Sequence, residues 1–276
     1  MAQARLVEKH PLDDIIRADR MPHIWCPGCG IGIAMRCYAH ALLRSEVPAE
    51  KHVVVSGIGC SGRVAGYMNI DSYHTTHGRA IPFAVGLKLA NPELEVLVFS
   101  GDGDLAAIGG NHLIHGARRN VDITVICANN FNYGMTGGQL GPTTPYMART
   151  TTSPYGCPEL PLNLVYLLAA AGANFVSRWT TLHVRQVIDD ILYAFQKPGF
   201  SFIEVLSPCP IGFGKSNDFE QGIEEMKFYR ERCQLGDGVP LEDLGIDLTG
   251  DRPIYVGRFV DRDAPPYTPV RLEGEQ

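Results

Sequence analysis

The chain has 276 residues, of which 45% are hydrophobic and 20% charged, and its formal net charge is −6. This composition is that of a foldable chain long enough for one large domain or two small ones. The negative charge argues against a nucleic-acid partner. The amino terminus lacks the apolar core of a signal peptide, and no stretch reaches the ~20 apolar residues of a membrane span, so we expect a cytoplasmic protein without membrane association.

Strand-like and helix-like segments alternate along most of the chain. Periodicity predicts strands near 52–57, 95–100, 121–128, 174–178 and 201–206. It predicts helices over 29–45, 78–91, 105–119, 162–172 and 181–196. This alternation predicts an α/β fold, with a mostly parallel sheet that helices cover on both faces.

Two regions break the alternation. Residues 131–162 hold many Gly, Pro and Thr residues and are predicted to form a long functional loop. Residues 234–276 are predicted to form an extended C-terminal arm that packs on this or a neighbouring subunit, with a disordered tail as the alternative. We therefore divide the chain into an α/β domain, residues 1–233, and a C-terminal extension, residues 234–276.

Four cysteines fall where the chain turns at one predicted edge of the sheet. Cys26 and Cys29 form a C-x-x-C turn before the first predicted helix, while Cys60 and Cys209 each follow a predicted strand. In a reducing cytoplasm such cysteines favour metal or redox use over disulfides. Four thiolates at one edge suit a [4Fe–4S] cluster, and a proline after a ligand, as at Cys209, is common there.

Other uses of the cysteines remain open. A thioredoxin-like redox pair belongs to a far smaller domain, and structural zinc usually takes two close cysteine pairs, of which this chain has one. Cys37 and Cys127 lie in apolar patterns and are predicted to be buried hydrophobic residues. Nothing is assigned to Cys157 or Cys233.

Two polar clusters follow neighbouring predicted strands, Gly101-Asp102-Gly103-Asp104 after the first and Asn129-Asn130 after the second. The carboxyl ends of parallel strands meet at one edge, where open α/β sheets bind ligands. Asp102, Asn130 and the carbonyl of Asn132 would supply the oxygen ligands that Mg²⁺ prefers and shares with phosphates. The glycines let the main chain approach a diphosphate, whose charge the helix amides attract. An ordinary strand-to-helix turn is the alternative.

These clusters resemble the thiamin diphosphate motif, which opens with GDG and closes with NN at a comparable spacing. Residues 10–235 are similar to the β subunits of 2-oxoacid:ferredoxin oxidoreductases, through the segments WCPGCG (25–30), GIGCSGR (57–63), HTTHGR (74–79), NNFNYGMTGGQ (129–139) and PCP (208–210). The resemblance implies a thiamin diphosphate-binding fold of the diphosphate type. It also implies an enzyme that converts a 2-oxoacid and coenzyme A into an acyl-CoA and CO₂, and passes electrons through a [4Fe–4S] cluster to ferredoxin.

Residues 57–80 and 129–146 are most similar to the 2-oxoglutarate enzymes, which form succinyl-CoA and can run in the CO₂-fixing direction of the reductive TCA cycle. Some relatives carry a lysine in the segment equivalent to 136–139, where this chain has glycines. Arg63 and Arg149 are then candidates for the cation that faces the distal carboxylate of the substrate, as is an arginine of another chain. The same reaction on pyruvate or a branched or aryl 2-oxoacid is an alternative.

The resemblance also implies a role for individual residues. Mg²⁺ would be held by Asp102, Asn130 and Asn132, and the cluster by Cys26, Cys29, Cys60 and Cys209. The diphosphate would contact Gly103, Asp104 and Thr136, and the thiazolium ring would be bordered by Ile58, Gly59, Cys60 and Ser61. The other cofactor-binding positions are Gly101, Tyr133, Gly134, Met135 and His77. Cys60 and His77 are the predicted catalytic residues; for His77, a structural histidine bonded to backbone is the alternative.

Partners follow from what this chain lacks. Thiamin activation needs a carboxylate near the aminopyrimidine, usually on a second domain, so the resemblance implies a larger α subunit that contributes this glutamate. An (αβ)₂ assembly is expected, and the single chain is expected to be inactive. Acidic ferredoxin would need a local basic patch, for which Lys215 is a candidate. The alternatives of another class are a non-redox thiamin diphosphate enzyme with structural zinc and a non-enzymatic cluster-holding electron-transfer protein.

Overall fold

The computed structural model describes residues 10–250 and 252–268. Its centre is an eight-stranded sheet with the strand order β2-β1-β3-β4-β8-β7-β10-β9. The first six strands in this order are parallel: β2 (Asp71–His74), β1 (His52–Ser56), β3 (Glu95–Gly101), β4 (Thr124–Asn129), β8 (Ser201–Leu206) and β7 (Phe175–Thr180). The predicted α/β fold with a mostly parallel sheet is confirmed.

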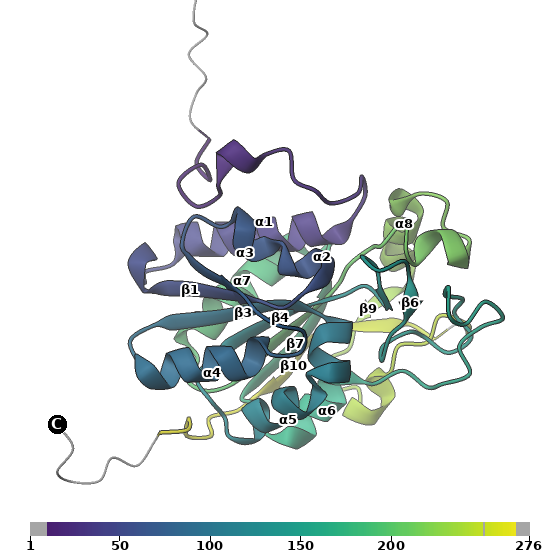
Figure 1. Ribbon diagram of the computed structural model, residues 1–276. Coiled ribbons are helices and arrows are strands. Elements are labelled where there is room, and N and C mark those ends of the chain that lie inside the picture. Colours follow the sequence, from purple (N-terminus) through teal and green to yellow (C-terminus); the bar gives the residue numbers. More distant parts are fainter. Residues whose placement is uncertain (1–9, 251, 269–276) are drawn as a thin grey trace, which may run out of the picture.

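Helices cover both faces of this sheet (Figure 1). On one face, α1 (Gly30–Arg44) packs against α7 (Val184–Gln196), beside the short helices α2 (Gly59–Gly62) and α3 (Val64–Tyr67). On the other face lie α4 (Ala80–Ala90), α5 (Gly110–Arg118) and α6 (Leu164–Ala171). A π-helical segment, η3 (Gly103–Ile108), leads into α5. All five predicted strands and five predicted helices are present, with ends shifted by a few residues.

The central strands are apolar on both sides because each side faces a separate core. In β1, the side chain of Val54 packs into the core under α1 and α7, whereas those of Val53 and Val55 pack into the core under α4, α5 and α6. Successive side chains of a strand point to opposite faces, so a strand covered on both faces must be apolar throughout. This explains why the short continuous apolar runs of the sequence are strands.

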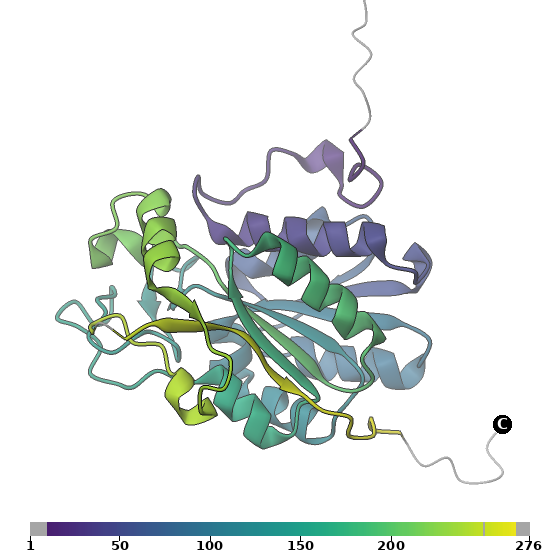
Figure 2. The same cartoon turned by 180° about the vertical axis from the view of Figure 1, so that it is seen from behind.

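The C-terminal part of the chain joins the same sheet (Figure 2). β10 (Ile254–Asp261) pairs antiparallel with β7, and β9 (Cys233–Leu235) lies beside β10. Within the predicted arm, residues 251 and 269–276 lie outside the described residues. Asp190 of α7 accepts hydrogen bonds from Arg258 of β10 and from Trp179 of β7, both at 2.6 Å, so the arm packs on its own chain.

Several elements have no counterpart among the predicted ones, among them β2 and the helix α8 (Gly222–Arg232). β2 reads DSYH and is largely exposed, and α8 reads GIEEMKFYRER, with few apolar side chains. Neither has the apolar periodicity on which a prediction from sequence depends. The start of α8 is instead fixed by a capping box, in which the side chains of Gln221 and Glu224 each bond to the backbone of the other residue.

The strand order places a crevice at one edge of the sheet. From β1 the chain crosses to β2 on one side and then returns to β3 on the other side of β1. The loops that leave β1 and β3 therefore diverge, and such a switch point is where open α/β sheets bind ligands.

In the part of the chain that the structure describes, no helix is long and apolar enough to cross a membrane.

One ion pair is buried within the sheet. Arg178 of β7 lies opposite Glu204 of β8, both are 1% exposed, and their Nε and Oε2 atoms are 2.6 Å apart. Arg178 also donates to the carbonyl of Leu244, and Glu204 accepts from the amide of Asn129. The pair therefore links the C-terminal segment to the end of β4.

Replacing Arg178 with Met should lower the free energy of unfolding by about 3–5 kcal/mol, because Glu204 would remain buried without its cation. The matched control is Arg149→Met, which breaks an exposed Arg–Asp pair of the same 2.6 Å length and should cost about 0–1 kcal/mol. Urea unfolding followed by circular dichroism measures both. Equal losses in the two variants would contradict this account.

Candidate functional site

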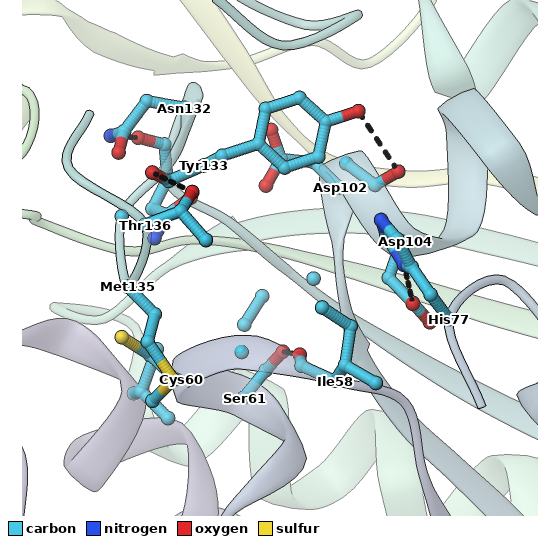
Figure 3. Close-up of a pocket in the computed structure, with 17 residues that line it drawn as sticks. Ile58, Cys60, Ser61, His77, Asp102, Asp104, Asn132, Tyr133, Met135 and Thr136 are labelled. Carbon is cyan, nitrogen blue, oxygen red and sulfur yellow. Dashed lines mark hydrogen bonds and ion pairs between the residues drawn. The ribbon is translucent and has the colours of Figure 1, made fainter. Parts of the chain in front are cut away.

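A pocket opens at the carboxyl edge of the sheet, and seventeen residues line it (Figure 3). Most come from the turn after β1, the loop before α4, the end of β3 with the turn that follows it, and the segment after β4, while Ile31 belongs to α1 and Ala128 to β4. All fifteen positions that the sequence analysis assigns to catalysis or cofactor binding are among them: Ile58, Gly59, Cys60, Ser61, His77, Gly101, Asp102, Gly103, Asp104, Asn130, Asn132, Tyr133, Gly134, Met135 and Thr136. Ile31 and Ala128 complete the lining.

Asp102 lies at the base of the pocket and is 1% exposed. Burial raises the pKa of its carboxyl group to about 6, although a hydrogen bond from Thr143 opposes the rise. The Thr143 hydroxyl lies 2.5 Å from Asp102 Oδ2 and 3.0 Å from the amide oxygen of Asn129. Thr143 comes from the long loop after β4 and was not predicted, because no local pattern in the sequence marks it.

The side-chain amide of Asn130 directs its oxygen toward two other oxygen atoms, the carbonyl of Asn132 at 2.8 Å and Asp102 Oδ1 at 3.1 Å. If the amide group were turned over, its nitrogen would donate hydrogen bonds to both. With the oxygen of Asn130 in this position, the oxygen atoms of Asn130, Asn132 and Asp102 repel one another unless a cation lies among them. Adjacent ligands of an octahedral Mg²⁺ ion with bonds of ~2.0–2.1 Å are about 2.9 Å apart. The arrangement therefore fits the ion for which the sequence predicts these ligands.

Asp104 faces His77 rather than open space (Figure 3). Its carboxylate accepts from His77 Nδ1 at 2.5 Å, from the Gly78 amide at 2.8 Å and from the Ser100 hydroxyl at 2.8 Å. Because a carboxylate can only accept, Nδ1 carries a proton, and this bond orients the imidazole ring. The predicted contact of Asp104 with a diphosphate stays a prediction. The hydrogen bonds of Asp104 in the structure indicate a second role, which is to orient the ring of His77.

Two glycines are required by close packing around these side chains. A Cβ atom at Gly57 would lie 2.0 Å from Asp104 Oδ2 and 2.1 Å from the Ser100 hydroxyl. A Cβ atom at Gly103 would lie 2.4 Å from the ring of Tyr133. Gly57 keeps the turn after β1 against Asp104, and Gly103 brings the main chain of η3 against Tyr133.

The segments that carry the four predicted cluster cysteines are joined by direct contacts. The indole of Trp25 donates to the carbonyl of Cys60 at 2.8 Å, and the amide of Gly30 donates to the carbonyl of Pro208 at 3.0 Å. Cys209 Sγ lies 3.9 Å from the side-chain oxygen of Asn132. The C-x-x-C turn therefore meets the turns after β1 and β8 next to the pocket.

The four predicted cluster cysteines differ in exposure: Cys26 is exposed, whereas Cys29, Cys60 and Cys209 are partly buried. The pKa of Cys29 is raised to about 12, mainly by burial and in smaller part by the charges of Cys209, Cys60 and Cys26, while a hydrogen bond with the backbone of Ile31 opposes the rise. Burial likewise raises the pKa of Cys60 and Cys209. Where no cation is bound, burial therefore favours the neutral form of the Cys29, Cys60 and Cys209 thiols. Within residues 10–250 and 252–268, no three His, Cys, Asp or Glu side chains converge closely enough to hold a single metal ion.

The other cysteines and cations lie elsewhere. Cys37 and Cys127 are fully buried, as predicted. None of the described residues that line the pocket is a lysine or arginine. Arg149, a predicted substrate contact, pairs instead with Asp218 at the surface, and Arg63 is exposed at the end of α2. Lys215 is exposed in the turn that follows Cys209.

Comparison with known proteins gives consistent matches. Residues 57–205 match the C-terminal TPP-binding domain of thiamine pyrophosphate enzymes. The chain is 49% identical to 2-oxoglutarate synthase subunit KorB of Methanocaldococcus jannaschii over 94% of both chains, and 53% identical to that of Methanothermobacter marburgensis over 82% of this chain and 79% of the relative. A solved 2-oxoglutarate:ferredoxin oxidoreductase from Magnetococcus marinus, with 2-oxoglutarate, coenzyme A and succinyl-CoA bound, is 29% identical with a TM-score of 0.81, covering 97% of this chain and 90% of that one.

Replacing Gly57 with Ala should lower the free energy of unfolding by about 2 kcal/mol or more, because the new methyl group overlaps Asp104 and Ser100. The matched control is Gly86→Ala in α4, where nothing lies within 4 Å of the added atom. The control should stabilise the protein by about 0.5–1 kcal/mol, since alanine favours helix. Urea unfolding measures both changes, and a neutral Gly57→Ala variant would refute the packing argument.

Proposed function

Because the chain belongs to the β subunits of the 2-oxoacid:ferredoxin oxidoreductases, within the thiamin diphosphate enzymes, we propose that it acts on 2-oxoglutarate and coenzyme A. The products are succinyl-CoA, CO₂, one proton and two electrons, and ferredoxin takes the electrons. Relatives named 2-oxoglutarate synthase subunits, which match most of the chain, support this substrate. The observation that carries the proposal is the pocket itself, in which the predicted thiamin-site residues lie together beside four cysteines.

Thiamin diphosphate with Mg²⁺ is the proposed ligand of the pocket. Asp102, the side chain of Asn130 and the carbonyl of Asn132 would hold the ion, which the convergence of their oxygens supports. Gly103 and Thr136 would contact the diphosphate, while Ile58 and the residues after it would border the thiazolium ring. When bound, the cofactor supplies an electron sink for the bond to the departing CO₂. His77, with its ring oriented by Asp104, would contact the reacting groups.

A [4Fe–4S] cluster is the proposed ligand of Cys26, Cys29, Cys60 and Cys209. Such a cluster binds each thiolate to a different iron atom, so the four sulfurs need not converge on one point as the ligands of zinc do. The hydrogen bonds that join the segments carrying these cysteines, from Trp25 to Cys60 and from Gly30 to Pro208, support this choice. Cys60 also lines the pocket. Electrons from the substrate would therefore have a short path to the cluster.

A larger α subunit is the proposed partner, in an (αβ)₂ assembly. Among the described residues that line the pocket, Asp102 and Asp104 are the only carboxylates, and both are engaged by neighbouring groups. The glutamate that thiamin activation requires would come from the α subunit. The cation for the distal carboxylate of 2-oxoglutarate would come from there as well, since the described part of this chain places no lysine or arginine in the pocket lining.

Co-expression with the α subunit tests the substrate. We expect the purified complex to reduce ferredoxin with 2-oxoglutarate and coenzyme A at a kcat/KM at least about tenfold above that with pyruvate or branched 2-oxoacids, which is ~1.4 kcal/mol of discrimination. The single chain should show no turnover. Preference for pyruvate would overturn the substrate assignment, and robust turnover by the chain alone would overturn the partner.

Replacing Cys60 with Ala tests the cluster in the same complex. We expect iron and sulfide content and the brown absorbance to fall, and ferredoxin reduction to be lost, because the cluster loses a ligand at the pocket wall. Cys157→Ala is the control: Cys157 is buried, bonds to the carbonyl of Glu159 and does not line the pocket, whereas Cys60 is partly buried and lines it. Full activity and full iron content in Cys60→Ala would refute the cluster assignment.

A further inference from the structure

Cys26, Cys29, Cys60 and Cys209 are together called the cysteine group. A second hollow lies on the side of this group that faces away from the pocket. It is an open groove of about 860 Å³ between the segment that precedes α1 and the outer side of α1, and it extends to the start of α7 and to Met226 of α8. Figure 1 shows the N-terminal segment arching over α1, and Figure 2 shows the same from behind. Cys26 and Cys29 line this groove, and Cys26 is exposed. The groove and the pocket share no lining residue.

The lining of the groove is apolar with a basic rim. Ile33, Met35 and Met226 supply flexible apolar surface, of the kind that adapts to different partners. Arg36 is exposed on the rim, and His40 lies one helical turn further along α1. Asp13 is the only acidic residue among the described residues that line the groove.

The charge of α1 stands out in an acidic protein. The helix reads GIGIAMRCYAHALLR and contains no acidic residue, although the chain as a whole carries a net charge of −6. Arg36 and Arg44 are both exposed on it, and none of the described residues forms an ion pair with either of them. Unpaired positive charges beside an apolar groove steer a negatively charged partner towards it.

We propose that this groove is the docking surface for an acidic one-electron carrier, the ferredoxin of the proposed function. The inference rests on that function, because it takes the cysteine group to hold the redox centre. One side of the group, at Cys60, faces the pocket where the substrate is oxidised, and the other side, at Cys26 and Cys29, faces the groove. The two electrons released per 2-oxoglutarate would leave singly through this side, each reducing one ferredoxin cluster.

The size of the groove and its charge favour a transient carrier. Electron-transfer complexes bury little surface and dissociate quickly, whereas permanent subunits bury large apolar interfaces. An open groove with the exposed, charged side chain of Arg36 on its rim fits the first kind of contact. Rim charges act mainly on the rate of association and on its salt dependence. Docking should therefore be measurable apart from the chemistry in the pocket.

The test is Arg36→Glu in the assembled αβ complex, assayed with a purified 2[4Fe–4S] ferredoxin. We expect kcat/KM for ferredoxin to fall about tenfold at low ionic strength, and the fall to shrink as added salt screens the charges. Calorimetric titration with oxidised ferredoxin should show weaker binding. Reduction of methyl viologen with 2-oxoglutarate should stay unchanged, because a small dye needs no docking surface. The matched control is Arg119→Glu, an exposed arginine after α5 on the opposite face of the sheet.

The possible outcomes separate docking from function. Equal ferredoxin kinetics in Arg36→Glu and the wild type, or an equal loss in Arg119→Glu, would overturn the docking site while viologen reduction still supports the proposed function. Failure of the Arg36→Glu chain to assemble with the α subunit would identify the groove as a subunit interface and would also overturn it. If the wild-type complex reduces neither ferredoxin nor methyl viologen, both the proposed function and the docking site are overturned.

Discussion

The site depends on six strands that run in the same direction. Because β1, β3, β4 and β8 all end at one edge, the turns that follow them meet there. Cys60 follows β1 and Cys209 follows β8, so the two lie at the same edge although they are 149 positions apart in the sequence. The register is fixed by two apolar cores, one on each face, so that a shift by one residue would exchange the side chains of every central strand between them. The packing of apolar side chains thus sets the positions of the polar ones.

Most of the fold could be predicted from sequence because the central strands and their helices carry strong apolar periodicity. The pocket residues could be predicted because they follow strand ends directly, as Asp102 and Asn130 do. Thr143 could not, since its position depends on the path of an irregular loop. The bond between Asp104 and His77 was also beyond reach, because the two residues belong to different turns and no local rule relates them.

Buried polar groups connect the pocket to the far side of the sheet. Asp102 is bonded to Thr143, Thr143 to Asn129, Asn129 to Glu204, and Glu204 to Arg178, whose guanidinium reaches the carbonyl of Leu244. Buried polar groups of this kind are costly unless all their partners are present. The C-terminal segment, none of whose described residues lines the pocket, is therefore connected through these bonds to the carboxylate of Asp102.

The two hollows on either side of the cysteine group have separate linings. In the proposed arrangement the cysteine group acts as a partition, with carbon compounds confined to one chamber and the protein acceptor to the other. An electron can tunnel through such a wall, but a molecule cannot pass it. The acceptor would never meet the reacting carbon, and the enzyme could exchange its electron carrier without opening the chamber in which the carbon–carbon bond is broken.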